Sequence, residues 1–136
     1  MASNPDVSVI ITNYNYEKYI SRAVRSCLNQ SYVNHEVIVV DDCSTDKSIE
    51  ALRPFQEQVR IVSTGVNAGV AAAANTGVKN SRGQFFIRVD ADDYVNKDMC
   101  YMMKTYLEAN HDALCVSCDY LMVDNFENTL TRKYAE

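Results

Sequence analysis

Glycine is scarce in this sequence and tryptophan is absent. The four glycines are Gly65, Gly69, Gly77 and Gly83, and none of them follows the first apolar segment of the chain. The sequence therefore lacks the G-x-G-x-x-G and Walker loops that surround phosphate with backbone N–H groups. A ligand that carries phosphate would need its charge neutralised in another way, by a bound cation for example.

Long apolar runs and an excess of basic residues are also missing. No run approaches the roughly 20 residues of a membrane-spanning helix, and Met1–Asp6 lacks the basic and apolar regions of a signal peptide. These absences favour a cytoplasmic location. The net charge of −5 argues against a nucleic-acid backbone as the main partner, because such binding depends on Lys and Arg. The length of 136 residues fits one domain, which we expect to span 1–136.

The five cysteines are dispersed and odd in number, which indicates free thiols in a chain without a secretion signal. Cys115 and Cys118 form a lone C-x-x-C, whereas a zinc site usually has a second pair. Both lie in an apolar run. We therefore expect buried thiols there rather than a metal or redox site.

Short runs rich in β-branched residues alternate with stretches whose apolar residues recur at helical spacing. Strands are predicted at Val7–Ile11, Glu36–Val40, Val59–Val62, Gln84–Val89 and Ala113–Cys118, the last with Val123 as its furthest limit. Helices are predicted to carry residues 19–28, 49–52, 70–79 and 99–107. This alternation predicts a three-layer α/β/α fold with a mainly parallel sheet. The polar chain from Asp124 onward is expected to fray.

Polar clusters directly follow three of the predicted strands. They are Thr12–Asn15, Asp41–Asp42 and Asp90–Asp93. In open parallel sheets, ligands bind beyond the carboxyl ends of the strands, at the point where the strand order reverses. With a strand order of 3-2-1-4, Tyr14, Asp42 and Asp92 would share one crevice.

The cluster Asp90–Asp93 is the strongest candidate for chemistry. Its three carboxylates lie within four residues and repel one another, and a bound hard cation would relieve that repulsion. Mg²⁺ and Mn²⁺ both accept carboxylate and phosphate oxygens together.

The other two clusters also have structural interpretations. The tyrosine and asparagines of Thr12–Asn15 could pack at a strand end or serve turns. Asp41 and Asp42 could cap the next helix, although Ser44 or Thr45 already meets that need. Two adjacent acids at a buried strand end exceed what a cap requires, which favours a function for them.

Four segments together resemble the inverting family 2 glycosyltransferases, which have the GT-A fold. They are Val7–Asn15, Val39–Asp46, Asn67–Val70 with Asn75–Gly77, and Asp90–Asp93. A D-x-D sequence alone would be weak, but four motifs in the family's order and spacing are specific. The resemblance implies an enzyme that binds a nucleoside-diphosphate sugar, with a UDP-sugar favoured. It would transfer the sugar to a saccharide or lipid-linked acceptor, as in polysaccharide biosynthesis.

The resemblance also implies site residues. Thr12 and Tyr14 look like contacts to the nucleotide base, and Asp42 looks like an acceptor for uracil N3–H. Asp92 and its neighbours look like the D-x-D group that meets the ribose and a Mn²⁺ or Mg²⁺ ion bridging the diphosphate. The implied donor-binding set is Thr12, Asn13, Tyr14, Asn15, Asp41, Asp42, Asn67, Gly69, Asp90, Ala91 and Asp92, and the implied metal ligands are Asp90, Asp92 and Asp93.

The sequence departs from the family in two respects. Many members have an arginine before the Asn of the third motif, where this chain has Ala74. Inversion also needs a carboxylate base, and none of Asp112, Asp119, Asp124 and Glu127 is convincing. We therefore expect a donor-binding half, with the acceptor half and the base outside this chain.

Two alternatives stay open on the sequence. One is a module that binds a nucleotide or nucleotide sugar without catalysis. The other is a receiver-like signalling domain, although the first strand ends in Thr12–Tyr14 and not in the acidic pair that receivers need. Peripheral association with the cytoplasmic face of a membrane and self-association through an exposed sheet edge are left open as well.

Overall fold

A computed structural model describes residues 3–32 and 34–135 of the chain. Met1 and Ala2, which belong to the N-terminal segment considered above, lie outside the described residues. The chain divides into two compact units, Met1–Tyr101 and Met102–Glu136, which we describe separately. A single domain over 1–136 stays a prediction.

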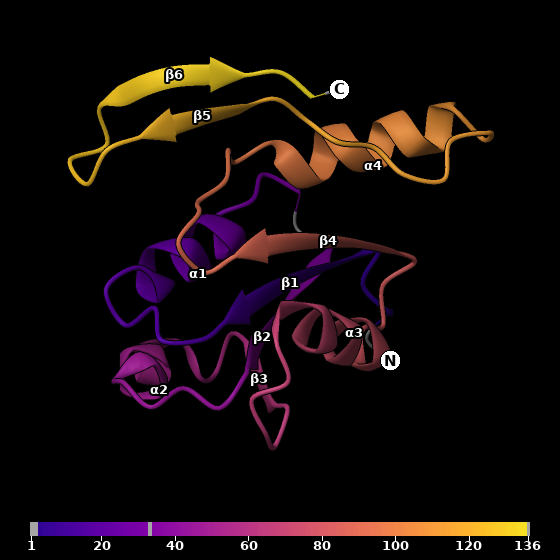
Figure 1. The fold of residues 1–136 in the computed structure, drawn as a ribbon. Coiled ribbons are helices and arrows are strands. Elements are labelled where there is room, and N and C mark those ends of the chain that lie inside the picture. The colour runs from indigo at the N-terminus through magenta and orange to yellow at the C-terminus, as the bar shows by residue number, and fades with distance from the viewer. Residues whose placement is uncertain (1–2, 33, 136) are drawn as a thin grey trace. The chain divides into compact units, whose positions relative to one another are not determined.

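The first unit is built on a four-stranded parallel sheet (Figure 1). Its strands are β1 (Val7–Asn13), β2 (His35–Asp41), β3 (Arg60–Ser63) and β4 (Phe85–Asp90), in the order β3-β2-β1-β4. The predicted fold class and strand order are confirmed. All seven residues of β1 are buried, which explains its nearly unbroken apolar sequence.

Helices cover both faces of this sheet, as Figure 1 shows. They are α1 (Ile20–Leu28), α2 (Ser48–Leu52) with the short 3₁₀ turn η1 (Arg53–Phe55), α3 (Val70–Asn80) and the start of α4 (Met99–Ala109). Side chains of a strand alternate between its faces. Accordingly, Ile10 and Ile38 pack with Ala73 of α3, whereas their neighbours in sequence pack with α1 and α2.

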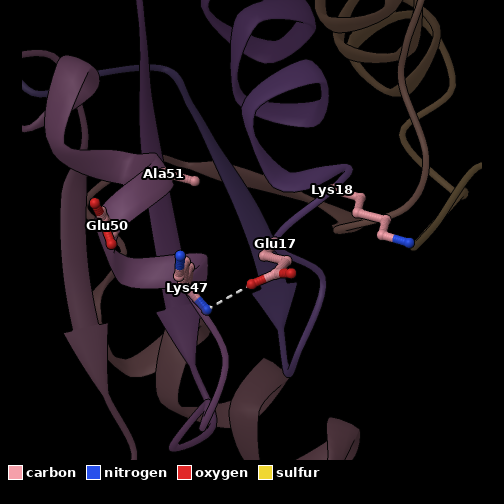
Figure 2. Close-up of a pocket in the computed structure, with 5 residues that line it drawn as sticks. All are labelled: Glu17, Lys18, Lys47, Glu50 and Ala51. Atoms are coloured by element: carbon pink, nitrogen blue, oxygen red, sulfur yellow. Dashed lines mark hydrogen bonds between the residues drawn. The ribbon is translucent and has the colours of Figure 1, made fainter.

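The loops that follow β1 and β2 are tied together beside α2. The backbone N–H of Lys47 donates to Glu17 Oε2 at 2.8 Å, and the N–H of Glu17 donates to Asp46 Oδ2 at 2.9 Å. Figure 2 shows the shallow hollow at this place, lined by Glu17, Lys18, Lys47, Glu50 and Ala51, with Lys18 pointing away from the others. Asp46 also accepts the N–H of Ser48, so the predicted capping of this helix by Ser44 or Thr45 is wrong.

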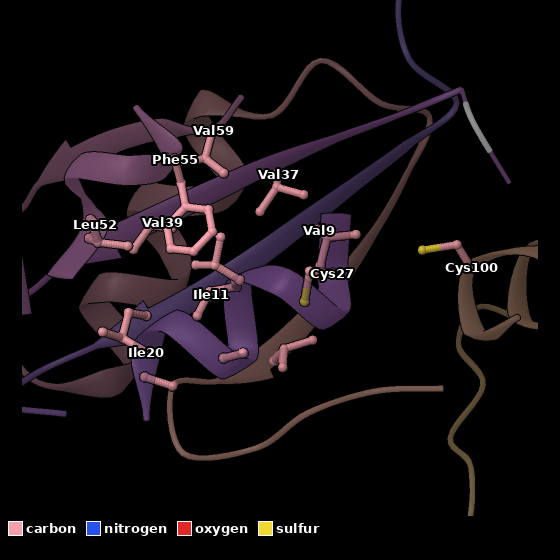
Figure 3. Close-up of a cluster of buried hydrophobic side chains, with 14 of the residues drawn as sticks. Val9, Ile11, Ile20, Cys27, Val37, Val39, Leu52, Phe55, Val59 and Cys100 are labelled. Atoms are coloured by element: carbon pink, nitrogen blue, oxygen red, sulfur yellow. The ribbon is translucent and has the colours of Figure 1, made fainter. Parts of the chain in front are cut away.

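The larger apolar cluster lies between the sheet and helices α1 and α2 (Figure 3). Val9, Ile11 and Ile20 are fully buried in it, and so is the thiol of Cys27. Burial raises the pKa of Cys27 to about 12 and that of Cys100, in the first turn of α4, to about 11. These two thiols are therefore inert apolar side chains at neutral pH. The thiols that were expected to be buried, Cys115 and Cys118, are exposed, so that prediction is wrong.

The second unit contains most of α4 and an antiparallel hairpin of β5 (Tyr120–Val123) and β6 (Thr129–Lys133). The predicted strand Ala113–Cys118 is wrong: this stretch has no regular structure, and Cys115 and Cys118 are exposed free thiols. Chain beyond Asp124 was expected to fray but is paired. The reason is a turn in which Asp124 Oδ1 accepts the N–H groups of Phe126 and Asn128 at 2.8 and 2.9 Å. None of the described helices is long and apolar enough to cross a bilayer.

Candidate functional site

The strand register brings the three polar clusters to one edge of the sheet. Asn13 lies opposite Asp41 of β2, and Thr12 lies opposite Asp90 of β4. The ladder continues past the strands, because the N–H of Ala91 donates to the Thr12 carbonyl and the N–H of Asp42 donates to the Asn13 carbonyl. The loops after β1, β2 and β4 therefore start from a common platform, the hydrogen-bonded strand ends at Asn13, Asp41 and Asp90.

Asn13 and Asp41 form a buried network that shapes this platform. Asn13 Nδ2 donates to Asp41 Oδ1 at 2.8 Å and to Ser44 Oγ at 3.0 Å. Asp41 also accepts the Ser44 hydroxyl at 2.6 Å and the Ser44 N–H at 3.0 Å. Asn13 and Asp41 are 2% and 4% exposed. The amide nitrogen of Asn13 and the carboxylate of Asp41 are thus committed to the protein, which supports the structural interpretation for Asp41, whereas Asn13 Oδ1 is buried without a hydrogen-bond partner.

Asn15 connects the loop after β1 to the loop after β2. Its backbone is in the left-handed region, with φ 59°, a conformation that Asn tolerates better than most residues. Its Oδ1 accepts the N–H of Thr45 at 2.8 Å, while its own N–H donates to Ser44 Oγ at 3.0 Å. Asn15 thereby holds the segment that presents the exposed ring of Tyr14.

Asp42 anchors the loop between β3 and α3. Its carboxylate accepts the Thr64 hydroxyl at 2.7 Å and the N–H groups of Ala68 and Gly69 at 2.9 and 2.7 Å. Gly69 is required by its backbone, with φ 86°, and not by crowding. An ionised carboxylate offers about four acceptor positions, so about one remains on Asp42, which is 3% exposed. Asn67, in the same loop, is exposed.

These hydrogen bonds determine the charge state of Asp42. Burial pushes its pKa upward, but the donors from Ala68, Thr64 and Gly69 outweigh burial and hold the pKa below the ordinary value of 3.8. A carboxyl group with a lowered folded-state pKa stabilises the fold above its unfolded-state pKa. That contribution disappears as the pH falls through the folded-state value.

We expect Asp42→Ala to lower the free energy of unfolding at pH 7 by about 2 kcal/mol, because three donors lose a charged acceptor. The difference from the parent protein should shrink as the pH falls from about 4 toward 2. Urea unfolding at several pH values measures both effects. The exposed Glu57→Ala provides the control, and a pH-independent difference would contradict the assignment.

The acidic turn after β4 contains Asp90, Ala91, Asp92 and Asp93. Asp90 accepts the Thr12 hydroxyl at 3.2 Å and pairs with exposed Arg88 at 3.3 Å. Burial, followed by the charges of Asp92 and Asp90, raises the pKa of Asp93 above its ordinary value. Ala91 is fully buried and anchors the turn. The turn thus presents concentrated negative charge.

No three His, Cys, Asp or Glu side chains within residues 3–32 and 34–135 are grouped as a ready metal site. The predicted set of Asp90, Asp92 and Asp93 is therefore not preassembled. Magnesium-type ions need no complete protein cage, since one or two carboxylates commonly hold them together with substrate phosphates and water. The donor chemistry fits a divalent ion that arrives with a diphosphate.

Tyr16 and Arg22 belong to this region, although neither was predicted from the sequence. The pKa of Tyr16 is raised, first by the charge of Asp92, then by burial and by Asp90 and Asp93, so its phenol lies near the acidic turn. Arg22 donates to the carbonyl oxygen of Asp92 at 3.0 Å. The one signal in the sequence for Arg22 is its spacing from Tyr19, about one helical turn, which places the two side chains on the same face of α1.

Comparison with known proteins identifies the class. The family described as "Glycosyl transferase family 2" matches residues 8–135, and the chain belongs to this family. The receiver-like alternative is thereby set aside. The parallel sheet of order β3-β2-β1-β4 is that of GT-A structures.

Individual relatives are longer than this chain. An uncharacterized glycosyltransferase of Haemophilus influenzae is 38% identical over 110 residues, which cover 79% of this chain and 44% of that protein. The structure of Staphylococcus aureus TarS 1–349 in complex with UDP-GlcNAc has a TM-score of 0.71 and 32% identity, covering 78% of this chain and 32% of that one. The Pyrobaculum calidifontis mannosyltransferase PcManGT, in complex with GDP-Man and Mn²⁺, has a TM-score of 0.70 and 28% identity, covering 77% and 33%. The chain thus spans less than half the length of these relatives.

Proposed function

We propose that this chain is the donor-binding part of a glycosyltransferase that uses a nucleoside-diphosphate sugar and a divalent ion. The observation that carries this proposal is the register, which places Asp42 and the Asp90–Asp93 turn on opposite sides of β1 at one sheet edge. Strands β2 and β4 are two strand spacings apart, about 10 Å. A nucleoside diphosphate lying across the end of β1 would reach both groups.

Each group is proposed to meet a different part of the donor. Tyr14 is 43% exposed at the end of β1, where its ring can lie against a base. Asp42 retains about one acceptor position, which suits an N–H such as uracil N3–H. Thr12 is 6% exposed and donates to Asp90, so we propose that it orients the acidic turn as well as bordering the base site.

The diphosphate would require a cation, because this edge of the sheet carries acids and no phosphate-binding glycine loop. Asp92 with Asp90 or Asp93 would hold Mn²⁺ or Mg²⁺ together with the diphosphate oxygens. Such an ion, when bound, stabilises the negative charge that develops on the departing nucleoside diphosphate. The role of the chain's own carboxylates is to place the positive ion beside the sugar–phosphate bond.

Transfer with inversion needs a carboxylate base, and no described residue is assigned to it. Asp119 and Asp124 were candidates, but both serve local structure. Asp119 accepts the Ala135 N–H at 3.1 Å and pairs with Arg132, and its pKa is lowered. Hydrogen bonds from Asn128 likewise lower the pKa of Asp124. We propose that the base, and the contacts to a saccharide or lipid-linked acceptor, lie outside this chain.

This lack of a base favours a second candidate, a module that binds the donor without turning it over. Assaying donor hydrolysis and sugar transfer by this chain and by a longer form with a C-terminal extension separates the two. Transfer by the longer form alone identifies a donor-binding part. Binding without transfer in both forms identifies the non-catalytic module. We also propose a cytoplasmic location, with peripheral membrane association and self-association as further properties to be tested.

Calorimetric titration with UDP, UDP-GlcNAc, GDP and GDP-Man, each with Mn²⁺ and with EDTA, tests the proposed function. We expect a uridine nucleotide to bind more tightly than its guanosine counterpart, and only when metal is present. Binding of none of the four ligands in either condition would refute the proposal. Equal binding with Mn²⁺ and with EDTA would refute the role of the ion.

Tyr14→Ala should weaken Mn²⁺-dependent UDP binding by about 5- to 150-fold, because stacking of a base on an aromatic ring contributes about 1–3 kcal/mol. Tyr14→Phe keeps the ring and should bind UDP as the parent does. Calorimetry measures both variants. A large loss in Tyr14→Phe would assign the effect to the hydroxyl and contradict stacking.

A further inference from the structure

Arg22 joins helix α1 to the acidic turn that follows β4. Its Nη2 donates to the main-chain carbonyl oxygen of Asp92 at 3.0 Å. Its guanidinium carbon also lies 4.5 Å from the ring centroid of Tyr94, two residues further along the chain. One side chain therefore holds the turn at two points, through a hydrogen bond and through a ring contact.

The contact surface of Arg22 extends back to its own helix. The guanidinium carbon is 5.6 Å from the ring centroid of Tyr19, and that ring is 6.4 Å from the ring of Tyr16. The backbone carbonyl of Tyr16 accepts the N–H groups of Tyr19 and Ile20 where α1 begins. The aromatic residues thus link the end of the β1 loop to the turn through Arg22.

Arginine suits this position in a way that lysine does not. Its planar guanidinium can stack on a ring and donate a directed hydrogen bond at the same time, whereas an ammonium group is a compact point charge on a flexible chain. Its hydrogen bond to Asp92 is with the main-chain carbonyl and so does not occupy the Asp92 carboxylate, while its positive charge acts to lower the pKa of the neighbouring Asp93, which burial raises. Holding the main chain at this point restricts where the Asp92 carboxylate can be.

We propose that Arg22 is a positioning residue that presents the Asp92 carboxylate to the divalent ion of the donor, an inference that rests on the proposed function. Arg22 acts through the backbone of Asp92 and the ring of Tyr94 and does not need to touch the ligand. Groups that orient a metal ligand typically change metal affinity by about 10- to 100-fold when removed.

The variants Arg22→Ala and Arg22→Lys, with Arg25→Ala as the control, test the proposal. Arg25 is on the same helix, and its guanidinium lies 5.6 Å from the ring of Phe55, away from the acidic turn. In Arg22→Ala we expect the apparent Kd for Mn²⁺ at saturating UDP to rise by about 10- to 100-fold. Arg22→Lys should recover only part of this loss, and Arg25→Ala should bind Mn²⁺ and UDP as the parent does.

A second measurement, amide hydrogen exchange of residues 90–95 in the ligand-free chain, tests whether Arg22 holds the turn, and UDP binding with Mn²⁺ compared with EDTA separates a purely structural role. We expect this segment to exchange at least about tenfold faster in Arg22→Ala than in Arg25→Ala, while strand β1 is unchanged. Unchanged exchange of 90–95, or equal loss of UDP binding with Mn²⁺ and with EDTA, would overturn the proposal. If the parent binds no metal–nucleotide complex, the proposed function fails. Exchange then still decides whether Arg22 holds the turn.

Discussion

Replacing Gly77 with alanine should destabilise the first unit by about 2–3 kcal/mol, an overpacking cost. A Cβ at this position would lie 2.3 Å from Cγ2 and 3.3 Å from Cβ of Ile10, and 3.2 Å from Cγ2 of Val40. Ile10 and Val40 are β-branched, buried to 1% and 0% exposure, and set in central strands that cannot move aside. Helix α3 must therefore shift away from the sheet.

The sign of this effect is the diagnostic feature. Glycine in a helix interior is ordinarily about 0.5–1 kcal/mol worse than alanine, so propensity alone predicts stabilisation. Asn75→Ala, at an exposed position of the same helix, is the matched control and should be neutral or slightly stabilising. Urea unfolding of both variants at pH 7 measures the effect. A Gly77→Ala variant as stable as Asn75→Ala would mean that α3 does not pack this closely on β1 and β2.

The second large effect concerns ligand binding and not stability. Asp92→Ala should weaken Mn²⁺-dependent UDP binding by more than about 100-fold, because it removes a proposed direct ligand of the ion. Loss of groups that only orient such ligands already lowers metal affinity by about 10- to 100-fold. Asp92 is exposed, so the free energy of unfolding should change by less than about 0.5 kcal/mol. Calorimetry with Mn²⁺ and unfolding by urea separate the two quantities.

Glu57→Ala removes the same charge from an exposed position of the first unit and should leave binding unchanged. This control accounts for the long-range effect of net charge on an anionic ligand. Nucleotide binding that is independent of metal and unaffected by Asp92→Ala would remove the assignment of the acidic turn. Loss of binding in Glu57→Ala as well would mean that net charge, and not a ligand to the ion, governs the affinity.

The predictions from sequence succeeded where the pattern is local. Apolar, β-branched runs such as Val7–Ile11 can bury the side chains of both strand faces only between two layers of helices. Parallel strands in turn need crossover connections, which are usually helices. The meeting of Thr12–Asn15, Asp41–Asp42 and Asp90–Asp93 at one edge follows from parallel strands, whereas the order 3-2-1-4 was an assumption that the structure confirms.

The predictions failed where the partner of a segment comes from elsewhere in the chain. Ala113–Cys118 is apolar enough for a strand, yet the strand that forms is Tyr120–Val123, because β6 pairs with it. Periodicity cannot report a pairing partner. Nor could it assign Asp46 as the residue that accepts the Ser48 N–H.

The division of labour among the acids could not be read from the sequence either. Asp41 and Asp42 are adjacent, but the carboxylate of Asp41 accepts hydrogen bonds from Asn13 and Ser44. Asp42 instead holds the loop between β3 and α3 and keeps about one acceptor position. Arg22 is 70 residues from Asp92 in the chain and contacts its backbone. The sequence shows adjacent acids as equivalent, and only the residues that surround each side chain in the fold distinguish their roles.

By itself, the sequence determined the class of fold and the edge of the sheet where the chemistry lies. Hydrophobic alternation and the directional rule for parallel sheets act through neighbouring residues and need no long-range information. Only the tertiary structure decided which carboxylates are consumed in holding loops and which remain exposed for a ligand. Hydrogen bonds and desolvation depend on groups brought together from distant parts of the chain, and no local pattern specifies them.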